Sequence, residues 1–187
     1  MVHGTKGEIV IRNVKLITNK ERVQLNPISF TSGYNCLIGE NGSGKSTILK
    51  MLSGVTPQNQ KLIRGTDVIL DCSNTRVYYF DSEKSNPRTL SYFQNDIEFQ
   101  ISTMFVSHGE ALSSMFLHLN LSPESCLLLD EPESGLDIGN ILKVRDKLIG
   151  MECQVIVATH HPLLMVGNVI ELTPHYHQYV KGCFNKF

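Results

Sequence analysis

The chain has 187 residues, enough for one α/β domain, expected to span residues 1–187, that buries its core without disulfides or a structural metal. Its 17 Lys and Arg residues nearly balance its 18 Asp and Glu residues, so no overall positive charge points to nucleic acid as a partner. It shows neither the apolar core of a signal peptide nor an apolar run near the roughly 20 residues that span a bilayer. We therefore expect it to be soluble, cytoplasmic and unable to transport a solute by itself.

Strand and helix patterns alternate along the first half of the chain. Residues 7–17 alternate between apolar and polar side chains, which predicts a half-exposed strand. Residues 27–54 then predict a strand, a glycine-rich turn and a helix that begins near Gly44 and ends at Gly54. Short strands rich in β-branched and aromatic residues are expected at 67–71 and 75–81. The polar residues 82–95 are expected to form a loop or a short helical excursion.

The second half continues the alternation. A helix after residue 110 has one apolar stripe, formed by Ala111, Leu112, Met115, Phe116 and Leu119. Buried strands are expected at 125–130 and 153–158, with an edge strand at 168–172. Between them, a helix capped by Asp137 and ended by Gly150 has a stripe of Ile138, Ile141, Leu142, Leu148 and Ile149, and Pro162 opens another helix. This order predicts an α/β fold with a mostly parallel sheet and an antiparallel part from the N-terminal strands.

The cysteines and the C-terminal histidines do not suggest a metal site or a disulfide. The five cysteines are scattered without a C-x-x-C pair and fit reduced thiols in a cytosol: Cys36, Cys72, Cys126, Cys153 and Cys183. His175 and His177 are two residues apart on what reads as a strand or a tail, which is a weak arrangement for a metal ligand pair.

The segment GENGSGKS, residues 39–46, fits the pattern G-x-x-x-x-G-K-[ST] between a predicted strand and a predicted helix. Its glycines permit a turn whose backbone N–H groups wrap a β-phosphate. Lys45 would reach the β- and γ-phosphates, and Ser46 would offer its hydroxyl to Mg²⁺. The alternative is an ordinary strand-to-helix turn, but chance yields this pattern at roughly one position in 10⁴ to 10⁵. The other loop residues expected to contact the nucleotide are Asn41, Gly42, Ser43, Gly44 and Thr47.

Two further strand ends carry candidate catalytic groups. Asp130 and Glu131 follow a buried strand, where one carboxylate can hold Mg²⁺ and the other can orient an attacking water. Acidic strand ends are more often merely solvated, and the upstream phosphate loop favours the functional interpretation. His160 ends another buried strand, which places it on the same edge as Lys45 and predicts a γ-phosphate contact. His161 is a weaker candidate, because successive residues point in different directions.

The turn SHGE, residues 107–110, precedes a helix and allows two interpretations. Ser107 and nearby N–H groups can form a second anion site at a helix N-terminus. Alternatively the turn is only a helix cap in which Glu110 favours the helix dipole. Two phosphate-binding sites in one chain do not easily face the same nucleotide. This raises the question whether the second site serves a nucleotide bound to another subunit.

Taken together, these motifs resemble those of the ABC-type ATPases, a class of P-loop NTPases, over most of the chain from Ile9 to about Leu172. GENGSGKST resembles Walker A, CLLLDEP resembles Walker B, SGLD resembles the D-loop, THHP resembles the switch-histidine segment, and VSHGE resembles a variant signature. NCLIGENGSGKST and a signature ending in Glu are more similar to chromosome-maintenance, recombination and phage-defence ATPases than to transporter subunits. YYFDSEKSNPR is similar to small AAA-like proteins of this class in bacteria and phages.

The resemblance implies a head-to-tail homodimer that closes on two ATP molecules. Ser107 and Gly109 of one subunit would contact the γ-phosphate held by Lys45 of the partner subunit, through an interface of two equivalent patches. By the same resemblance Glu131 is the catalytic base or water-positioning residue, and Asp137 crosses the interface.

Several features depart from the family pattern. No aromatic residue precedes Phe30, so the aromatic that stacks on adenine in many transporter subunits is missing. Asp81 stands where the family usually has the Q-loop glutamine, and Glu83 or Gln94 are the candidate substitutes. The segment from this strand to Ser107 is too short for the helical subdomain that docks a transporter subunit onto its membrane part. A minimal ATPase head with a reduced helical subdomain is expected.

The leading interpretation is therefore a soluble ATPase that hydrolyses ATP to ADP and phosphate and acts, as an ATP-induced dimer, on DNA or on an effector protein. A second is an ATP-gated binding module with negligible turnover, because His108 replaces a glycine where backbone and phosphate approach closely. A third is the nucleotide-binding subunit of a transporter. A small-molecule kinase is disfavoured, because transfer to a small acceptor requires neither the Asp130-Glu131 pair nor SGLD.

Overall fold

The computed structural model describes residues 11–18, 28–54, 66–72, 76–82 and 108–184. Its centre is a five-stranded sheet in the order β5-β6-β7-β3-β8, in which every neighbouring pair is parallel. The strands are β3 (Tyr34–Ile38), β5 (Val77–Asp81), β6 (Cys126–Asp130), β7 (Gln154–Ala158) and β8 (Asn168–Glu171). Because parallel strands all end at one edge, the polar residues after β3, β6 and β7 gather there.

A second, three-stranded antiparallel sheet has the order β2-β1-β4. It consists of β1 (Ile11–Thr18), β2 (Ile28–Ser29) and β4 (Thr66–Cys72), and the β1–β4 register shifts between Ile11 and Asn13. The predicted fold class is confirmed, with a mostly parallel sheet and an antiparallel part formed by N-terminal strands.

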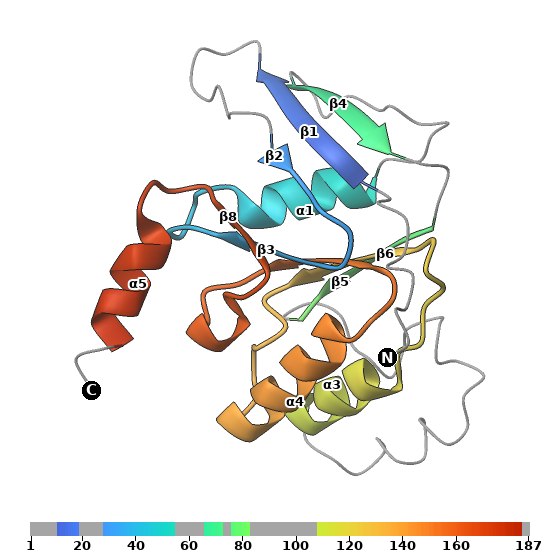
Figure 1. The fold of residues 1–187 in the computed structure, drawn as a ribbon, viewed down its shortest axis with the longest axis vertical. Helices are drawn as coiled ribbons and strands as arrows, with labels where there is room; N and C mark the ends of the chain where they lie inside the picture. The colour runs from blue at the N-terminus through green and yellow to red at the C-terminus, as the bar shows by residue number, and fades with distance from the viewer. Residues whose placement is uncertain (1–10, 19–27, 55–65, 73–75, 83–107, 185–187) are drawn as a thin grey trace, which may run out of the picture.

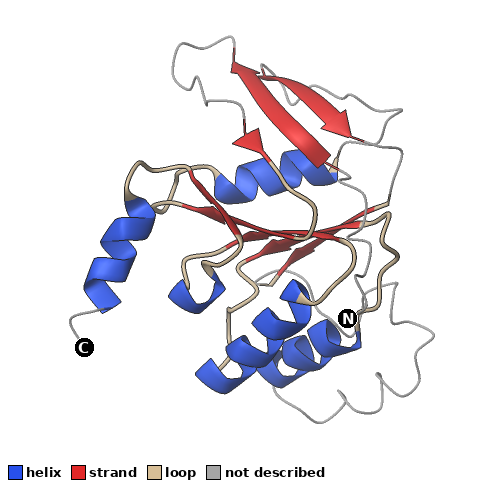
Figure 2. Ribbon diagram, in the orientation of Figure 1, coloured by secondary structure: helices blue, strands red, loops and turns tan. Residues whose placement is uncertain are grey.

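Helices cover both faces of the parallel sheet (Figures 1 and 2). On one face, α1 (Lys45–Ser53) lies between this sheet and the antiparallel sheet, and its Ile48, Leu49 and Leu52 join one buried cluster. On the other face, α3 (His108–His118) and α4 (Ile138–Ile149) pack together on a second cluster that includes Phe116 and Val144. Side chains alternate along β6, so Leu128 enters the first cluster and Leu127 the second. Both faces of the parallel sheet therefore have an apolar core, because side chains on a strand point alternately to the two faces.

The residues at the ends of α1 and α4 are ones that favour the start or the end of a helix. Gly44 precedes α1 in the left-handed region with φ of 97°, and Gly54 follows it. Asp137 caps α4 as predicted, since its carboxylate accepts a hydrogen bond from the Asn140 N–H at 2.8 Å. Gly150 ends this helix.

Other local predictions were wrong. Ile138 and Ile149 are 66% and 48% exposed, because the buried side of α4 is formed by Ile141, Val144 and Leu148. Pro162 opens only a short 3-10 turn, η3 (Pro162–Leu164), before the chain enters β8. The C-terminal segment read as a strand or tail is the helix α5 (Tyr176–Phe184), which lies beside the sheet. Residues 82–95 are described only at Ser82.

Candidate nucleotide site at the sheet edge

The phosphate loop follows β3 directly and leads into α1. The Ser43 N–H donates to the Glu40 carbonyl at 3.1 Å, which closes a turn within the loop. Gly42 and Gly44 have φ of 79° and 97°, and a Cβ added to either would meet no atom within 4 Å. The left-handed backbone, rather than lack of space, therefore favours glycine at both positions. Open space over a turn at a helix N-terminus suits a phosphate group.

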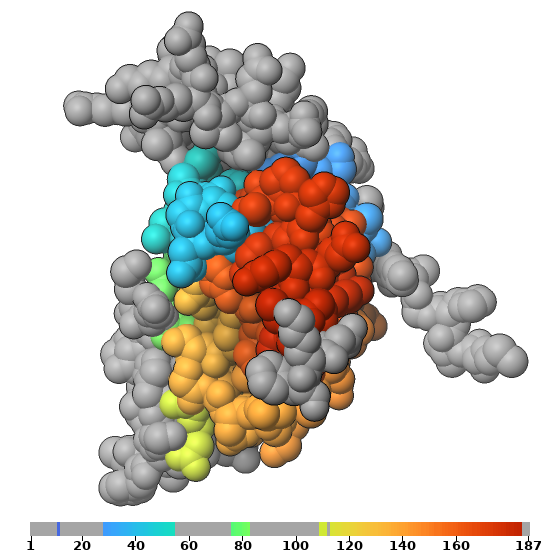
Figure 3. All heavy atoms as spheres, turned by 90° about the vertical axis from the view of Figure 1, so that its left-hand side faces the viewer, coloured from blue at the N-terminus to red at the C-terminus, as the bar shows by residue number. Residues whose placement is uncertain are grey.

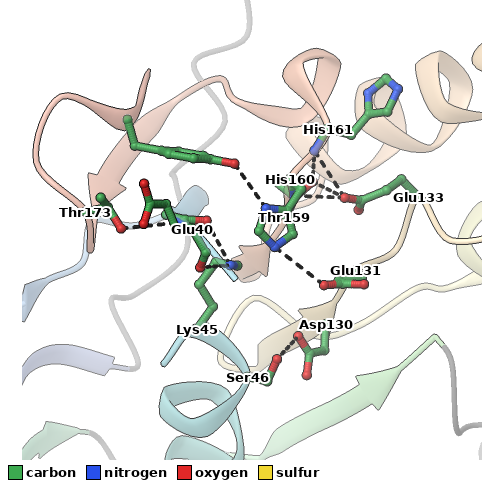
Figure 4. Close-up of polar contacts among 12 residues, drawn as sticks. Glu40, Lys45, Ser46, Asp130, Glu131, Glu133, Thr159, His160, His161 and Thr173 are labelled. Carbon is green, nitrogen blue, oxygen red and sulfur yellow. Dashed lines mark hydrogen bonds and ion pairs between the residues drawn. The ribbon is translucent and has the colours of Figure 1, made fainter. Parts of the chain in front are cut away.

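Lys45 carries its positive charge into this loop. It is only 5% exposed, and its ammonium donates to the carbonyls of Gly39 at 3.0 Å and Glu40 at 3.1 Å (Figure 4). Burial lowers the pKa of Lys45, while the nearby carboxylates, Glu131 and Asp130 foremost, act to raise it. The carboxylates favour a charged lysine, which is the form that attracts phosphate.

Ser46 and Asp130 meet across the sheet edge. The Ser46 hydroxyl donates to Asp130 Oδ1 at 2.9 Å (Figure 4). The Tyr79 hydroxyl donates to Asp130 Oδ2 at 3.2 Å, so the carboxylate is held from both sides. A hydroxyl and a carboxylate next to a phosphate loop are the hard oxygen donors that Mg²⁺ prefers, so the residues present fit this ion. Sequence reasoning missed Tyr79, whose contact depends on the pairing of β5 with β6.

Glu131 follows β6 in an uncommon backbone conformation, with φ of 50°. Its N–H donates to the Ala158 carbonyl at 2.9 Å, which ties it to the end of β7. A non-glycine residue in this region costs of order 1–3 kcal/mol and persists only where the surroundings impose it. The turn brings Glu131 Oε1 to 3.8 Å from His160 Nε2 (Figure 4).

The side chains of His160 and His161 point in different directions, as expected for successive residues. His160 faces Glu131 and the phosphate loop, whereas His161 points away and its Nδ1 accepts from the Leu163 N–H at 3.3 Å (Figure 4). Burial and the charge of Lys45 lower the pKa of His160, while Glu133 acts to raise it. The lowered pKa favours a neutral His160 imidazole near pH 7.

Glu133 organises the backbone of this segment and was missed by sequence reasoning. Its Oε1 accepts from the N–H groups of His160 at 3.0 Å and His161 at 3.2 Å, and from the Thr159 hydroxyl. The only signal in the sequence was its place two residues after Glu131, which does not reveal a contact across the sheet. Glu133 thus holds the segment that carries His160.

Asp81 ends β5 beside Asp130, with its side chain 9% exposed. Its carboxylate lies 3.9 Å from the Lys50 ammonium, and its Oδ2 lies 3.5 Å from the Tyr79 hydroxyl oxygen. The two candidates for the Q-loop position, Glu83 and Gln94, lie outside the described residues, as does Ser107.

Gly109 and Asp137 make their described contacts at the starts of α3 and α4. Gly109 is buried in the first turn of α3, and a Cβ added there would lie 2.0 Å from the Gly135 carbonyl oxygen. Gly109 of the predicted signature turn thus packs on the predicted D-loop of its own chain. Asp137 accepts hydrogen bonds from the backbone and side-chain nitrogens of Asn140. The helices α3 and α4, at whose starts these two residues lie, cover the face of the sheet opposite α1 (Figure 1).

Comparisons with known proteins agree with this geometry. Residues 25–106 match the family model described as ABC transporter. The chain is 23% identical over 198 residues to the zinc import ATP-binding protein ZnuC of Histophilus somni, covering 91% of this chain and 74% of that protein. These matches support an ABC-type ATP-binding domain with the P-loop NTPase fold. The chain is also 29% identical over 147 residues to the ABC transporter ATP-binding protein ARB1 of Saccharomyces cerevisiae, covering 66% of the chain and 24% of that protein.

A solved structure from Pyrococcus furiosus, described as an ABC transporter ATP-binding protein, shares the fold of this chain. Its TM-score is 0.57 at 18% identity, covering 87% of this chain and 96% of that one. The chain spans less than half the length of several curated relatives that it matches, including ARB1. Among the described residues, no helix has the length and apolar character needed to cross a bilayer.

Proposed function

We propose that this protein is an ATPase that hydrolyses ATP to ADP and phosphate. The observation that carries the proposal is the gathering of Lys45, Ser46, Asp130, Glu131 and His160 at the carboxyl ends of β3, β6 and β7 (Figure 4). These groups come from segments far apart in the chain, and the parallel sheet brings them to one edge. They supply the four kinds of group that phosphoryl transfer to water uses: a cation, oxygen ligands for a metal ion, a carboxylate and a hydrogen-bond donor.

Each side chain has a distinct part in this reaction. The Lys45 ammonium neutralises the β- and γ-phosphates, and the N–H groups of the loop hold them. Ser46 and Asp130 would hold Mg²⁺, which neutralises charge on the transferred phosphoryl group. Glu131 accepts a hydrogen bond from the attacking water and aims it, and His160 donates from its imidazole to the γ-phosphate.

We also propose that ATP joins two copies head to tail and so works as a switch. The placement of α3 and α4 on the face of the sheet opposite α1 supports this arrangement, because a second copy can bring its α3 turn to the phosphate loop. The dimer would form with ATP and open after hydrolysis. The surface that moves as the dimer closes and opens acts on DNA or on an effector protein, in chromosome maintenance or phage defence.

The test is the mass in solution of wild type and Glu131→Gln, with and without Mg-ATP, alongside phosphate release. We expect wild type to release phosphate and Glu131→Gln to form a dimer only with ATP. If both proteins remain monomeric and inactive, the proposal fails. A wild type that dimerises with ATP yet releases phosphate no faster than Glu131→Gln would instead indicate an ATP-gated binding module with negligible turnover.

A second candidate is the ATP-binding subunit of a transporter. The observation in its favour is the match to zinc import ATP-binding proteins, of which the chain covers 74–80%. This function requires a membrane partner. Expression in the native cell followed by detergent extraction would decide, since a transporter subunit should co-purify with a polytopic membrane protein and a switch acting on DNA should not.

A further inference from the structure

The imidazole of His160 is contacted on both nitrogens. Its Nδ1 lies 3.2 Å from the Tyr176 hydroxyl, and its Nε2 lies 3.8 Å from Glu131 Oε1. The rings of His160 and Tyr176 meet edge to face, with centroids 6.4 Å apart and an interplanar angle of 79°. Tyr176 is the first residue of α5, so a C-terminal helix reaches the group expected to contact the γ-phosphate.

The turn before α5 is attached to the phosphate loop. The Leu172 N–H donates to the Ile38 carbonyl at 2.8 Å, and the Glu40 N–H donates to the Thr173 hydroxyl at 3.1 Å. His175 has φ of 62°, a turn conformation, and Tyr176 then begins the helix. In the space-filling view the C-terminal segment, in red, borders the phosphate-loop region, in light blue (Figure 3). Tyr176 is therefore held in place by the same loop that forms the nucleotide site.

The charges around His160 decide where its proton lies. The groups that face it or act on it are Lys45, Glu131, Glu133 and Tyr176. Because burial and Lys45 lower the pKa of His160, the ring is neutral and carries one proton. The Glu131 carboxylate only accepts hydrogen bonds, which favours the proton on Nε2. Burial raises the pKa of Tyr176, so its phenol keeps the proton it donates to Nδ1.

We propose that Tyr176 is a positioning residue that donates a hydrogen bond to His160 Nδ1 and so fixes the tautomer with its proton on Nε2. The Nε2–H then points toward Glu131 and the phosphate end of the site. This role rests on the proposed function and deepens it. Tyr176 acts on the reaction only through His160, so its loss affects the orientation and tautomer of one imidazole rather than nucleotide binding.

The test compares Tyr176→Phe with Tyr179→Phe, a matched change on the same helix at a side chain that is 68% exposed. The ¹⁵N signals of the His160 imidazole are assigned by their loss in His160→Asn, since the chain has 7 histidines. In wild type and Tyr179→Phe we expect a protonated Nε2 and an unprotonated Nδ1. In Tyr176→Phe we expect the two signals to move toward each other as the tautomers mix. An unchanged tautomer in Tyr176→Phe overturns the proposal.

Two further measurements keep the proposal testable if Tyr176→Phe does not fold, and separate its failure from failure of the proposed ATPase function. If Tyr176→Phe does not fold, the wild-type spectrum still decides, because a proton on Nδ1 overturns the proposal. For phosphate release, loss of one neutral hydrogen bond should lower kcat about 2- to 10-fold in Tyr176→Phe with KM for ATP unchanged. A rise in KM with kcat unchanged contradicts the role. If wild type releases no phosphate, the proposed function fails while the tautomer result stands.

Discussion

At the scale of single residues, the candidate site depends on short polar contacts between strand ends. Asp130 is the centre of one such set, because it accepts hydrogen bonds from Ser46 and Tyr79. Both donors fix the rotamer of the carboxylate before any ion arrives. Burial and the adjacent Asp130 raise the pKa of Tyr79, so its hydroxyl remains a donor throughout the physiological pH range. An ordered carboxylate is a better metal ligand than a mobile one.

Replacing Ser46 with Ala should weaken the binding of Mg-ATP about tenfold or more, because one oxygen ligand and one hydrogen bond to Asp130 are lost. Binding of ATP in EDTA should change little, since Lys45 and the loop remain. Titration of a fluorescent ATP analogue with and without Mg²⁺ measures both. Ser53→Ala at the far end of α1 is the control. Equal losses in Mg²⁺ and in EDTA would contradict a metal-ligand role.

At the scale of elements, the first turn of α3 lies directly on the loop before α4. The closest approach is at Gly109, where a side chain would meet the Gly135 carbonyl oxygen, a backbone atom that cannot rotate away. Gly135 itself has φ of 75° and suits glycine for that reason. Gly109 of the predicted signature and Gly135 of the predicted D-loop are therefore in direct contact within one chain, and a shift of either segment would displace the other.

The change Gly109→Ala should lower the free energy of unfolding by about 1–3 kcal/mol, because the added methyl group must push the two segments apart. Urea denaturation measures this difference. Gly182→Ala is the matched control: Gly182 lies in α5 with nothing within 4 Å of its added Cβ, and Ala there should stabilise by about 0.5–1 kcal/mol. A Gly109→Ala protein as stable as wild type would show that the contact is loose.

At the scale of the whole molecule, a buried glutamine joins the two sheets. Gln154 begins β7 in the parallel sheet and is 1% exposed. Its side chain accepts from the Ile11 N–H at 2.8 Å and donates to the Ile11 carbonyl at 2.9 Å and the Thr31 carbonyl at 3.0 Å. The start of β1 is thereby fixed to the central sheet by side-chain hydrogen bonds rather than by strand pairing.

The change Gln154→Ala should lower the free energy of unfolding by about 2–4 kcal/mol, because it leaves the buried backbone groups of Ile11 and the part-buried Thr31 carbonyl without these partners. Chemical denaturation followed by circular dichroism gives the value. Gln178→Ala, on the exposed side of α5, should stay within about 0.5 kcal/mol of wild type. A similar small effect in both variants would mean that the antiparallel sheet is held by other contacts.

The sequence by itself determined the parts of this protein that depend on near neighbours in the chain. The glycines before Lys45 predicted the loop and the start of α1, and Asp137 predicted the cap of α4. Continuous apolar runs predicted β6 and β7, because strands covered on both faces carry apolar residues on both sides. The order of these elements was enough to predict the α/β class and the edge where the polar groups gather.

Tertiary structure alone decided the contacts between residues far apart in the chain. Tyr79 reaches Asp130 only because β5 pairs with β6, and Glu133 holds His160 only because β6 lies next to β7. The C-terminal residues lack a strong helical signal, and α5 was mistaken for a strand or tail, so Tyr176 was not a candidate. Local patterns record which backbone conformation is favoured. Which distant side chains then meet depends on how strands pair and where helices pack.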